Sequence, residues 1–250
     1  MIPKKFHWVH IPERPFKLHH YLSVKSAVER SEMEEFTIWL AGDDPEGEYW
    51  ERASDLVQVQ KVKAPTEIFG KPITQPAHKS DVIRLQVLIE HGGAYADLDV
   101  IVVKPFTQLL DNQFVMGQQN VGGAEGLCPA TMLGSKDSVF AKTWLAGFKD
   151  TFGGGPPGSP TWCTHSVNLP AYLANTMQET ITIADHEAFF WPLYHEDGVR
   201  NIFETPNYNA PNAYSIHLWE SSGKKYLDEM TEEKIKQGNS LFANTTKVLL

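Results

Sequence analysis

The chain has 250 residues and carries 22 Lys and Arg against 31 Asp and Glu, a formal charge of −9. This acidic balance argues against non-specific binding to nucleic acid or to anionic membranes. Two cysteines, Cys128 and Cys163, are too few for a disulfide framework or a cysteine-based zinc site. No apolar run reaches 18 residues, and the N-terminus lacks an apolar signal segment. We therefore expect a cytoplasmic protein without a transmembrane segment.

Strand and helix patterns alternate over the first 103 residues. Strands are expected over 6–10, 36–40, 56–62 and 95–103, and helices over 16–30 and 80–91. Gly92 and Gly93 end the second helix, and Pro105 ends the fourth strand. This alternation predicts an α/β fold with a Rossmann-like, mainly parallel central sheet that is flanked by helices.

The second half is less regular. Strands are expected over 114–116, 130–133 and 213–219, a helix over 139–148, and a helical, charged tail over 224–237. A Gly- and Pro-rich segment over 153–160 predicts a loop. No long linker interrupts the chain. We therefore expect a single domain over 1–250, with a core over about 2–222 and a C-terminal helical tail over about 223–250.

The densest chemical signal is the stretch Gly92-Gly93-x-Tyr95-x-Asp97-x-Asp99. Alternate residues of a strand share a face, so Asp97 and Asp99 are expected to point the same way. Two carboxylates on one side can hold a hard divalent cation through oxygen. A bare D-x-D pair is nevertheless more often two solvated carboxylates at the end of a strand.

The helix before this stretch adds a second signal. Asp81 and Arg84 are three residues apart and share a helix face, and the helix leads directly into the Gly-Gly turn. An arginine beside two carboxylates and a metal suits a phosphate or a sugar hydroxyl. The alternative is an ordinary ion pair within the helix.

Taken together, Ser80-Asp81-x-x-Arg84, Leu88 and Gly92-Gly93-x-Tyr95-x-Asp97-Leu98-Asp99-Val100 resemble the signature of sugar-nucleotide glycosyltransferases with a DXD motif. The resemblance is to family 32, which includes Och1-like mannosyltransferases and α-1,4-galactosyltransferases. The opening Ile2-Pro3-Lys4-x-x-His7 and the late Ala213-Tyr214-x-Ile216-His217-x-Trp219 are similar to two further family segments. His10 replaces the tryptophan that the family usually has in its first segment, and Trp8 is close by. Within this resemblance, only the motifs in residues 78–100 are specific to the family.

The resemblance implies a GT-A fold and a retaining transfer of a hexose from a nucleotide sugar to a hydroxyl of a glycan or glycolipid. We expect a UDP-hexose as donor, with GDP-mannose as the alternative. Mn²⁺ or Mg²⁺ would be held by Asp97, Asp99 and His217 against the donor diphosphate. The catalytic candidates are Asp81, Arg84, Asp97 and Asp99. The candidates for donor binding are Trp8, Val9, His10, Asp81, Arg84, Tyr95, Asp97, Trp219 and Ser222, with Ser221 as an alternative to Ser222.

No residue has to act as a covalent nucleophile, so we favour front-face attack, in which a donor phosphate oxygen takes the proton of the acceptor, over the alternative of double displacement. A membrane-borne acceptor would be met by peripheral contact. The sequence leaves two other classes open: a haloacid-dehalogenase-like phosphohydrolase, because of Asp97-x-Asp99, and a non-catalytic sugar-binding module. Trp162, His165 and Asn168 either line an acceptor groove or only pack and cap after the Gly/Pro loop.

Overall fold

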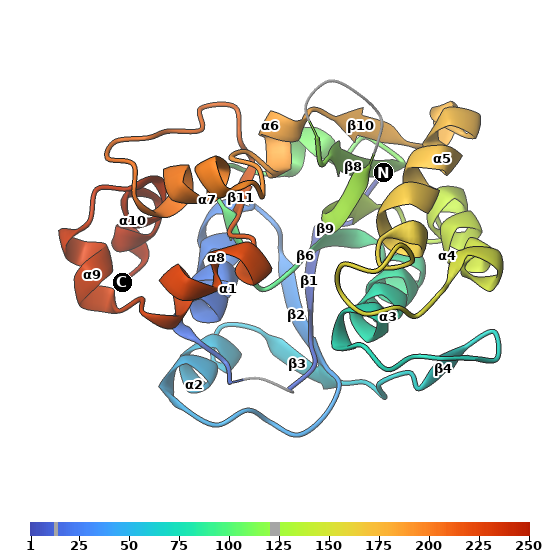
Figure 1. The fold of residues 1–250 in the computed structure, drawn as a ribbon, viewed down its shortest axis with the longest axis horizontal. Coiled ribbons are helices and arrows are strands. Elements are labelled where there is room, and N and C mark those ends of the chain that lie inside the picture. Colours follow the sequence, from blue (N-terminus) through green and yellow to red (C-terminus); the bar gives the residue numbers. More distant parts are fainter. Residues whose placement is uncertain (13–14, 121–125) are drawn as a thin grey trace.

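The computed structural model describes residues 1–12, 15–120 and 126–250 (Figure 1). Its central sheet has seven strands in the order β10-β8-β9-β6-β1-β2-β3. Within it, β9 is antiparallel to both of its neighbours, and the other neighbouring pairs are parallel. The expected α/β fold with a mainly parallel sheet is therefore confirmed.

The strands of this sheet are β1 (Lys5–His10), β2 (Glu35–Leu40), β3 (Gln58–Lys61), β6 (Gly93–Ala96), β8 (Phe114–Gln118), β9 (Leu127–Gly134) and β10 (Thr182–Ala184). Two small antiparallel pairs lie outside it: β7 (Val100–Val102) with β11 (Ser215–His217), and β4 (Glu67–Ile68) with β5 (Lys71–Pro72).

The α-helices are α1 (Leu18–Arg30), α2 (Glu48–Ser54), α3 (Pro76–His91), α4 (Val139–Thr151), α5 (Leu169–Thr176), α6 (His186–Phe189), α7 (Glu196–Phe203), α8 (Glu220–Asp228), α9 (Glu232–Gln237) and α10 (Leu241–Thr246). A π-helical turn covers Thr164–Asn168, and three 3₁₀ turns cover Thr107–Leu109, Gln178–Thr180 and Lys247–Leu249. Within the described ranges, no helix is long and apolar enough to cross a membrane.

Two apolar layers cover the sheet. The layer that contains α1 includes Phe6 and Trp8 of β1, and it also takes in buried residues of α8 to α10. The layer that contains α3 and α4 includes Val9 of β1 and Tyr95 of β6. Figure 1 shows α1 and α8 on one side of β1 and β6, and α3, α4 and α5 on the other. The alternation of side chains along β1 thus feeds both layers.

One expected strand is wrong, and it is the strand that matters most for the site. In place of a continuous strand over 95–103, β6 ends at Ala96 and β7 begins at Val100. The intervening residues form a turn, in which the Val100 N–H donates to the Asp97 carbonyl over 3.1 Å. The chain leaves the central sheet here because β7 pairs with the distant strand β11.

Other boundaries differ by smaller amounts. Helix α3 begins at Pro76, because a proline without an N–H group is well suited to the first turn of a helix. The late strand is shortened to Ser215–His217, and the charged tail forms two helices, α8 and α9, in place of one. The Gly/Pro segment over 153–160 is a loop, as expected.

Candidate active site

The D-x-D turn carries the first part of the site. Asp97 and Asp99 flank the turn between β6 and β7, and the pairing of β7 with β11 places His217 opposite Val100. Ligand atoms of Asp97, Asp99 and His217 all lie within 4.8 Å of one another. The two carboxylates therefore converge as expected, although a turn and not a continuous strand brings them together.

The second glycine before the motif is required by a close approach of two strands. Gly93 has a φ of +107°, and a Cβ atom there would lie 2.5 Å from the carbonyl oxygen of Lys5. Any other residue at this position would push β6 away from β1. The pairing of these two parallel strands fixes where the D-x-D turn begins.

Asp99 and His217 form a buried ion pair. The Nε2 of His217 lies 3.2 Å from Oδ2 of Asp99, and the backbone N–H of Glu220 donates to the same oxygen over 2.8 Å. Burial opposes a charge on the imidazole, but the Asp99 carboxylate outweighs it and raises the pKa of His217 to about 10. Burial likewise opposes a charge on Asp99, and His217 outweighs it, which lowers the pKa of Asp99.

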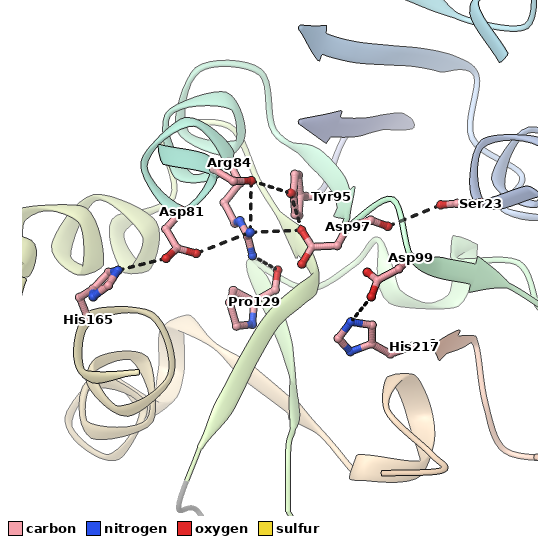
Figure 2. Close-up of polar contacts among 10 residues, drawn as sticks. Ser23, Asp81, Arg84, Tyr95, Asp97, Asp99, Pro129, His165 and His217 are labelled. Carbon is pink, nitrogen blue, oxygen red and sulfur yellow. Dashed lines mark hydrogen bonds and ion pairs between the residues drawn. The ribbon is translucent and has the colours of Figure 1, made fainter. Parts of the chain in front are cut away.

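Arg84 of α3 anchors the other carboxylate. Its Nη2 lies 3.1 Å from Oδ1 of Asp97 and 3.5 Å from Oδ1 of Asp81, and its Nη1 donates to the carbonyl of Pro129 over 3.1 Å (Figure 2). The hydroxyl of Tyr95 donates to Oδ1 of Asp97 over 2.6 Å. The guanidinium is thus fixed by partners on three segments.

These contacts set different pKa values for the two carboxyl groups. Burial, with the nearby charge of Asp99, raises the pKa of Asp97 against the attraction of Arg84. The Asp97 side chain is 28% exposed, so solvent moderates this effect. At Asp81, burial is outweighed by Arg84 and by a hydrogen bond from His165, and the pKa of Asp81 is lowered. Asp81 is therefore held as a carboxylate.

His165 is a part of this network that the sequence did not assign. Its Nε2 lies 3.0 Å from Oδ2 of Asp81, and its side chain is fully buried in the π-helical turn. It packs inside the protein and does not line a groove. Asn168 is exposed. The two residues His165 and Asp81 are 84 positions apart, so no local spacing could reveal their contact.

A cleft of about 630 Å³ joins most of these residues, a size typical of small-ligand sites. Its walls come from the end of β1, the start of α1, the start of α3, the D-x-D turn, the loop before the π-helical turn and the segment from β11 into α8. The residues proposed from the sequence that line it are Val9, His10, Arg84, Asp97, Asp99, His217, Trp219, Ser221 and Ser222. Further lining residues, not proposed as donor or metal ligands, include His20, Gln75, Trp162 and Glu220.

Three proposed donor-binding residues do not line the cleft. Trp8 is 0% exposed and packs against Phe6 with ring centroids 4.5 Å apart, so its expected role in donor binding is not supported. Residue 8 faces the layer around α1, whereas Val9 and His10 reach the cleft at the end of β1. Asp81 and Tyr95 lie behind the wall and act on it through Arg84 and Asp97.

The Asp97, Asp99 and His217 cluster fits a divalent cation by its chemistry. It offers carboxylate oxygens, which suit Mn²⁺ and Mg²⁺, together with one imidazole. The imidazole of His217 is protonated in its pair with Asp99, so it would release that proton on binding a metal. The contacts described above use Oδ1 of Asp97 and Oδ2 of Asp99. Among the described residues, no hydrogen bond or ion pair involves Oδ2 of Asp97 or Oδ1 of Asp99, so these two oxygens can serve a ligand in the cleft.

Comparisons with known proteins point in one direction. The family model described as the glycosyltransferase sugar-binding region containing a DXD motif matches residues 18–116. Glucan organizing enzyme 1 of Cryptococcus neoformans var. grubii is 30% identical over 260 residues, which cover 97% of this chain and 69% of that protein.

Two solved structures share the fold. The PaToxG glycosyltransferase superposes with a TM-score of 0.50 at 14% identity, covering 99% of this chain and 87% of that one. The apo form of the glycosyltransferase GlyE of Streptococcus pneumoniae TIGR4 superposes with a TM-score of 0.53 at 10% identity, covering 86% of this chain and 54% of that one. At these identities the similarity concerns the fold alone.

Proposed function

The chain belongs to the family of glycosyltransferases whose sugar-binding region contains a DXD motif, and from this premise we propose the reaction that it catalyses. It transfers a hexose from a nucleotide sugar to a hydroxyl of a glycan or glycolipid, with retention at the anomeric carbon. The favoured donor is a UDP-hexose, and GDP-mannose is the alternative. The observation that carries this proposal is the convergence of Asp97, Asp99, His217 and Arg84 on one cleft of a GT-A fold. The phosphohydrolase alternative rested on the D-x-D pair alone and has no support in the family match.

Asp97, Asp99 and His217 are the residues that would hold Mn²⁺ or Mg²⁺. A divalent metal bound there would supply Lewis-acid stabilisation to the departing diphosphate. Such stabilisation suits this protein in particular, because its net charge of −9 offers no general attraction to an anionic donor.

Arg84 supplies a second positive charge, and its position is set before the donor arrives. Its guanidinium is held by Asp81, Asp97 and the Pro129 carbonyl. It therefore needs little reorientation, at little cost in free energy, when charge develops on the donor. Asp81 has one oxygen facing Arg84 and the other facing His165. We therefore assign Asp81 as a positioning residue for Arg84.

The contacts of the two D-x-D carboxylates support front-face attack. Asp97 is engaged by Arg84 and Tyr95, and Asp99 by His217 and the backbone of Glu220. Carboxylates held in this way are poor candidates for a covalent nucleophile. The acceptor hydroxyl forms the new glycosidic bond as the bond to the diphosphate breaks, and its proton passes to the leaving phosphate oxygen.

Trp219, Ser221 and Ser222 lie where they can contact the donor diphosphate. They line the cleft at the start of α8, next to Asp99 and His217. Val9 and His10, at the end of β1, remain for the nucleoside. Burial lowers the pKa of His10 to about 4, so this imidazole is neutral and offers hydrogen bonds without charge.

The name of the relative suggests the first acceptors to try. Glucan organizing enzyme 1 matches nearly the whole of this chain, and its name refers to glucan. We propose a glucan chain as the acceptor within the broader class of glycans and glycolipids. Oligosaccharides of β-1,3-linked, β-1,4-linked and α-1,4-linked glucose are matched probes for this choice.

The test is a transfer assay with Mn²⁺, a panel of nucleotide sugars and these oligosaccharides. We expect one nucleotide sugar to be consumed, a lengthened oligosaccharide to form, and NMR of the product to show the anomeric configuration of the donor. Asp99→Asn should abolish turnover, whereas Asp137→Asn, which changes an exposed aspartate outside the cleft, should not. A product of inverted configuration contradicts the retaining mechanism, and phosphate release from simple esters without sugar transfer contradicts the proposal as a whole.

A further inference from the structure

The cleft is also lined by residues near the start of α3 that have no role in the site described so far. Five residues line this end: Gln75, Pro76, Ala77, Pro157 and Trp162. They come from the start of α3 and from the loop before the π-helical turn, and none of them carries a charge. This end therefore differs chemically from the metal end, where carboxylates, imidazole and guanidinium meet.

Trp162 is held in place from behind. Its ring centroid lies 4.6 Å from that of His78, which is 1% exposed. His78 in turn packs edge-on against His165 at 4.6 Å and Phe152 at 5.4 Å. The indole is half-buried and forms part of the cleft wall. Because rings support it from behind, its orientation is fixed before a ligand binds.

The same support reaches the reaction centre. His165, which packs against His78, also contacts Asp81, and Asp81 pairs with Arg84, which pairs with Asp97 (Figure 2). The Trp162 ring and the Arg84 guanidinium are therefore supported by one continuous set of buried side chains. A ligand on Trp162 would be positioned relative to Arg84 and Asp97 without a flexible element between them.

We propose that Trp162 forms the floor of a pyranose-binding subsite at the Arg84 end of the cleft. The inference rests on the proposed function, which supplies the pyranose. An aromatic face accepts the C–H face of a sugar ring, and the Gln75 amide beside it can donate to and accept from sugar hydroxyls. The uncharged lining suits a neutral sugar ring and not a diphosphate. The pyranose belongs either to the transferred hexose of the donor or to the acceptor glycan.

Two variants and one matched control test the subsite. Trp162→Ala removes the platform, and Trp162→Phe keeps an aromatic face. Trp39→Ala is the control, because Trp39 is also half-buried and stacked on a histidine, His91, at 4.9 Å, but lies outside the cleft lining. Melting temperatures of all variants show whether each one folds.

Calorimetry with Mn²⁺ measures the binding of UDP, UDP-glucose and UDP-galactose. The transfer assay measures the KM for laminarihexaose. We expect Trp162→Ala to weaken one sugar-containing partner roughly threefold to tenfold, with Trp162→Phe close to wild type. Weaker binding of a UDP-sugar with unchanged UDP binding assigns the subsite to the donor hexose. A raised KM for laminarihexaose with unchanged donor binding assigns it to the acceptor.

The proposal is overturned if Trp162→Ala changes neither quantity, or if it weakens UDP and the UDP-sugars equally. A wild-type protein that binds no nucleotide sugar would defeat the proposed function instead. In that case NMR detection of laminarihexaose binding, compared between wild type, Trp162→Ala and Trp39→Ala, still decides whether the subsite exists.

Discussion

Asp99 and His217 face each other across the antiparallel pair of β7 and β11, with Oδ2 of the carboxylate 3.2 Å from Nε2 of the imidazole. The backbone repeats this connection, because the Leu218 N–H donates to the Asp99 carbonyl over 2.8 Å. The late segment of the chain is thus clamped onto the D-x-D turn, and the metal-binding candidates are brought together by long-range pairing.

The Asp99–His217 pair should be coupled in stability as well as in activity. Each single variant, Asp99→Asn or His217→Gln, leaves a buried partner without its counter-charge, and we expect a loss of about 3 kcal/mol in the free energy of unfolding. The double variant should lose less than the sum of the two. Urea unfolding of the metal-free protein measures all three, and strictly additive losses would show that the pair is not coupled.

Arg84 should be needed for its planar fork as well as for its charge. Arg84→Lys keeps a cation but cannot reach Asp81, Asp97 and the Pro129 carbonyl together. We expect kcat to fall about 100-fold, with a smaller change in donor KM. The matched control is Arg200→Lys, which alters an exposed arginine paired with Glu204. A lysine variant with wild-type kcat would remove Arg84 from the reaction.

His165 should act through Asp81. Because a hydrogen bond from His165 helps to lower the pKa of Asp81, His165→Ala should let that pKa rise and should move the acid limb of the pH–rate profile to higher pH. His165→Gln retains a donor and should restore much of the wild-type profile. If His165→Ala lowers the melting temperature but leaves the pH–rate profile in place, its role is only structural.

The stability of the protein should fall as the pH falls below about 6.5. Burial lowers the pKa of His7 to about 4, so between these two values the unfolded chain binds a proton that the folded chain does not. This difference removes up to about 3 kcal/mol from the free energy of unfolding at the acid end. Melting curves of wild type and His7→Gln from pH 4 to 7 measure it. Equal slopes in the two proteins would show that His7 does not contribute.

The local part of the site was predictable from sequence, because its residues lie within one helix, one turn and one strand. Asp81, Arg84, Asp97 and Asp99 occupy 19 consecutive positions, and helix and strand geometry place them near one another. The break after Ala96 was not predictable, because it depends on the pairing of β7 with a strand more than 100 residues later.

The sequence also could not predict which face of the sheet each β1 side chain points to. Both faces of β1 are buried, so the run from Phe6 to His10 shows no polar alternation that would tell Trp8 from Val9. Trp162 lies in a loop and His165 in the π-helical turn that follows it, and no periodic pattern in the sequence links these residues to α3. The family resemblance at 78–100 predicted the reaction class. The residues that support the site could be identified only from the three-dimensional structure.

Calorimetry of nucleotide-sugar binding tests the central claim most directly. Titration of a UDP-hexose panel into wild-type protein should show binding that requires Mn²⁺ or Mg²⁺, and this binding should be lost in the double variant Asp97→Asn/Asp99→Asn but kept in Asp137→Asn. Binding that persists without a metal, or that survives the double variant, would contradict the role assigned to the Asp97, Asp99 and His217 cluster.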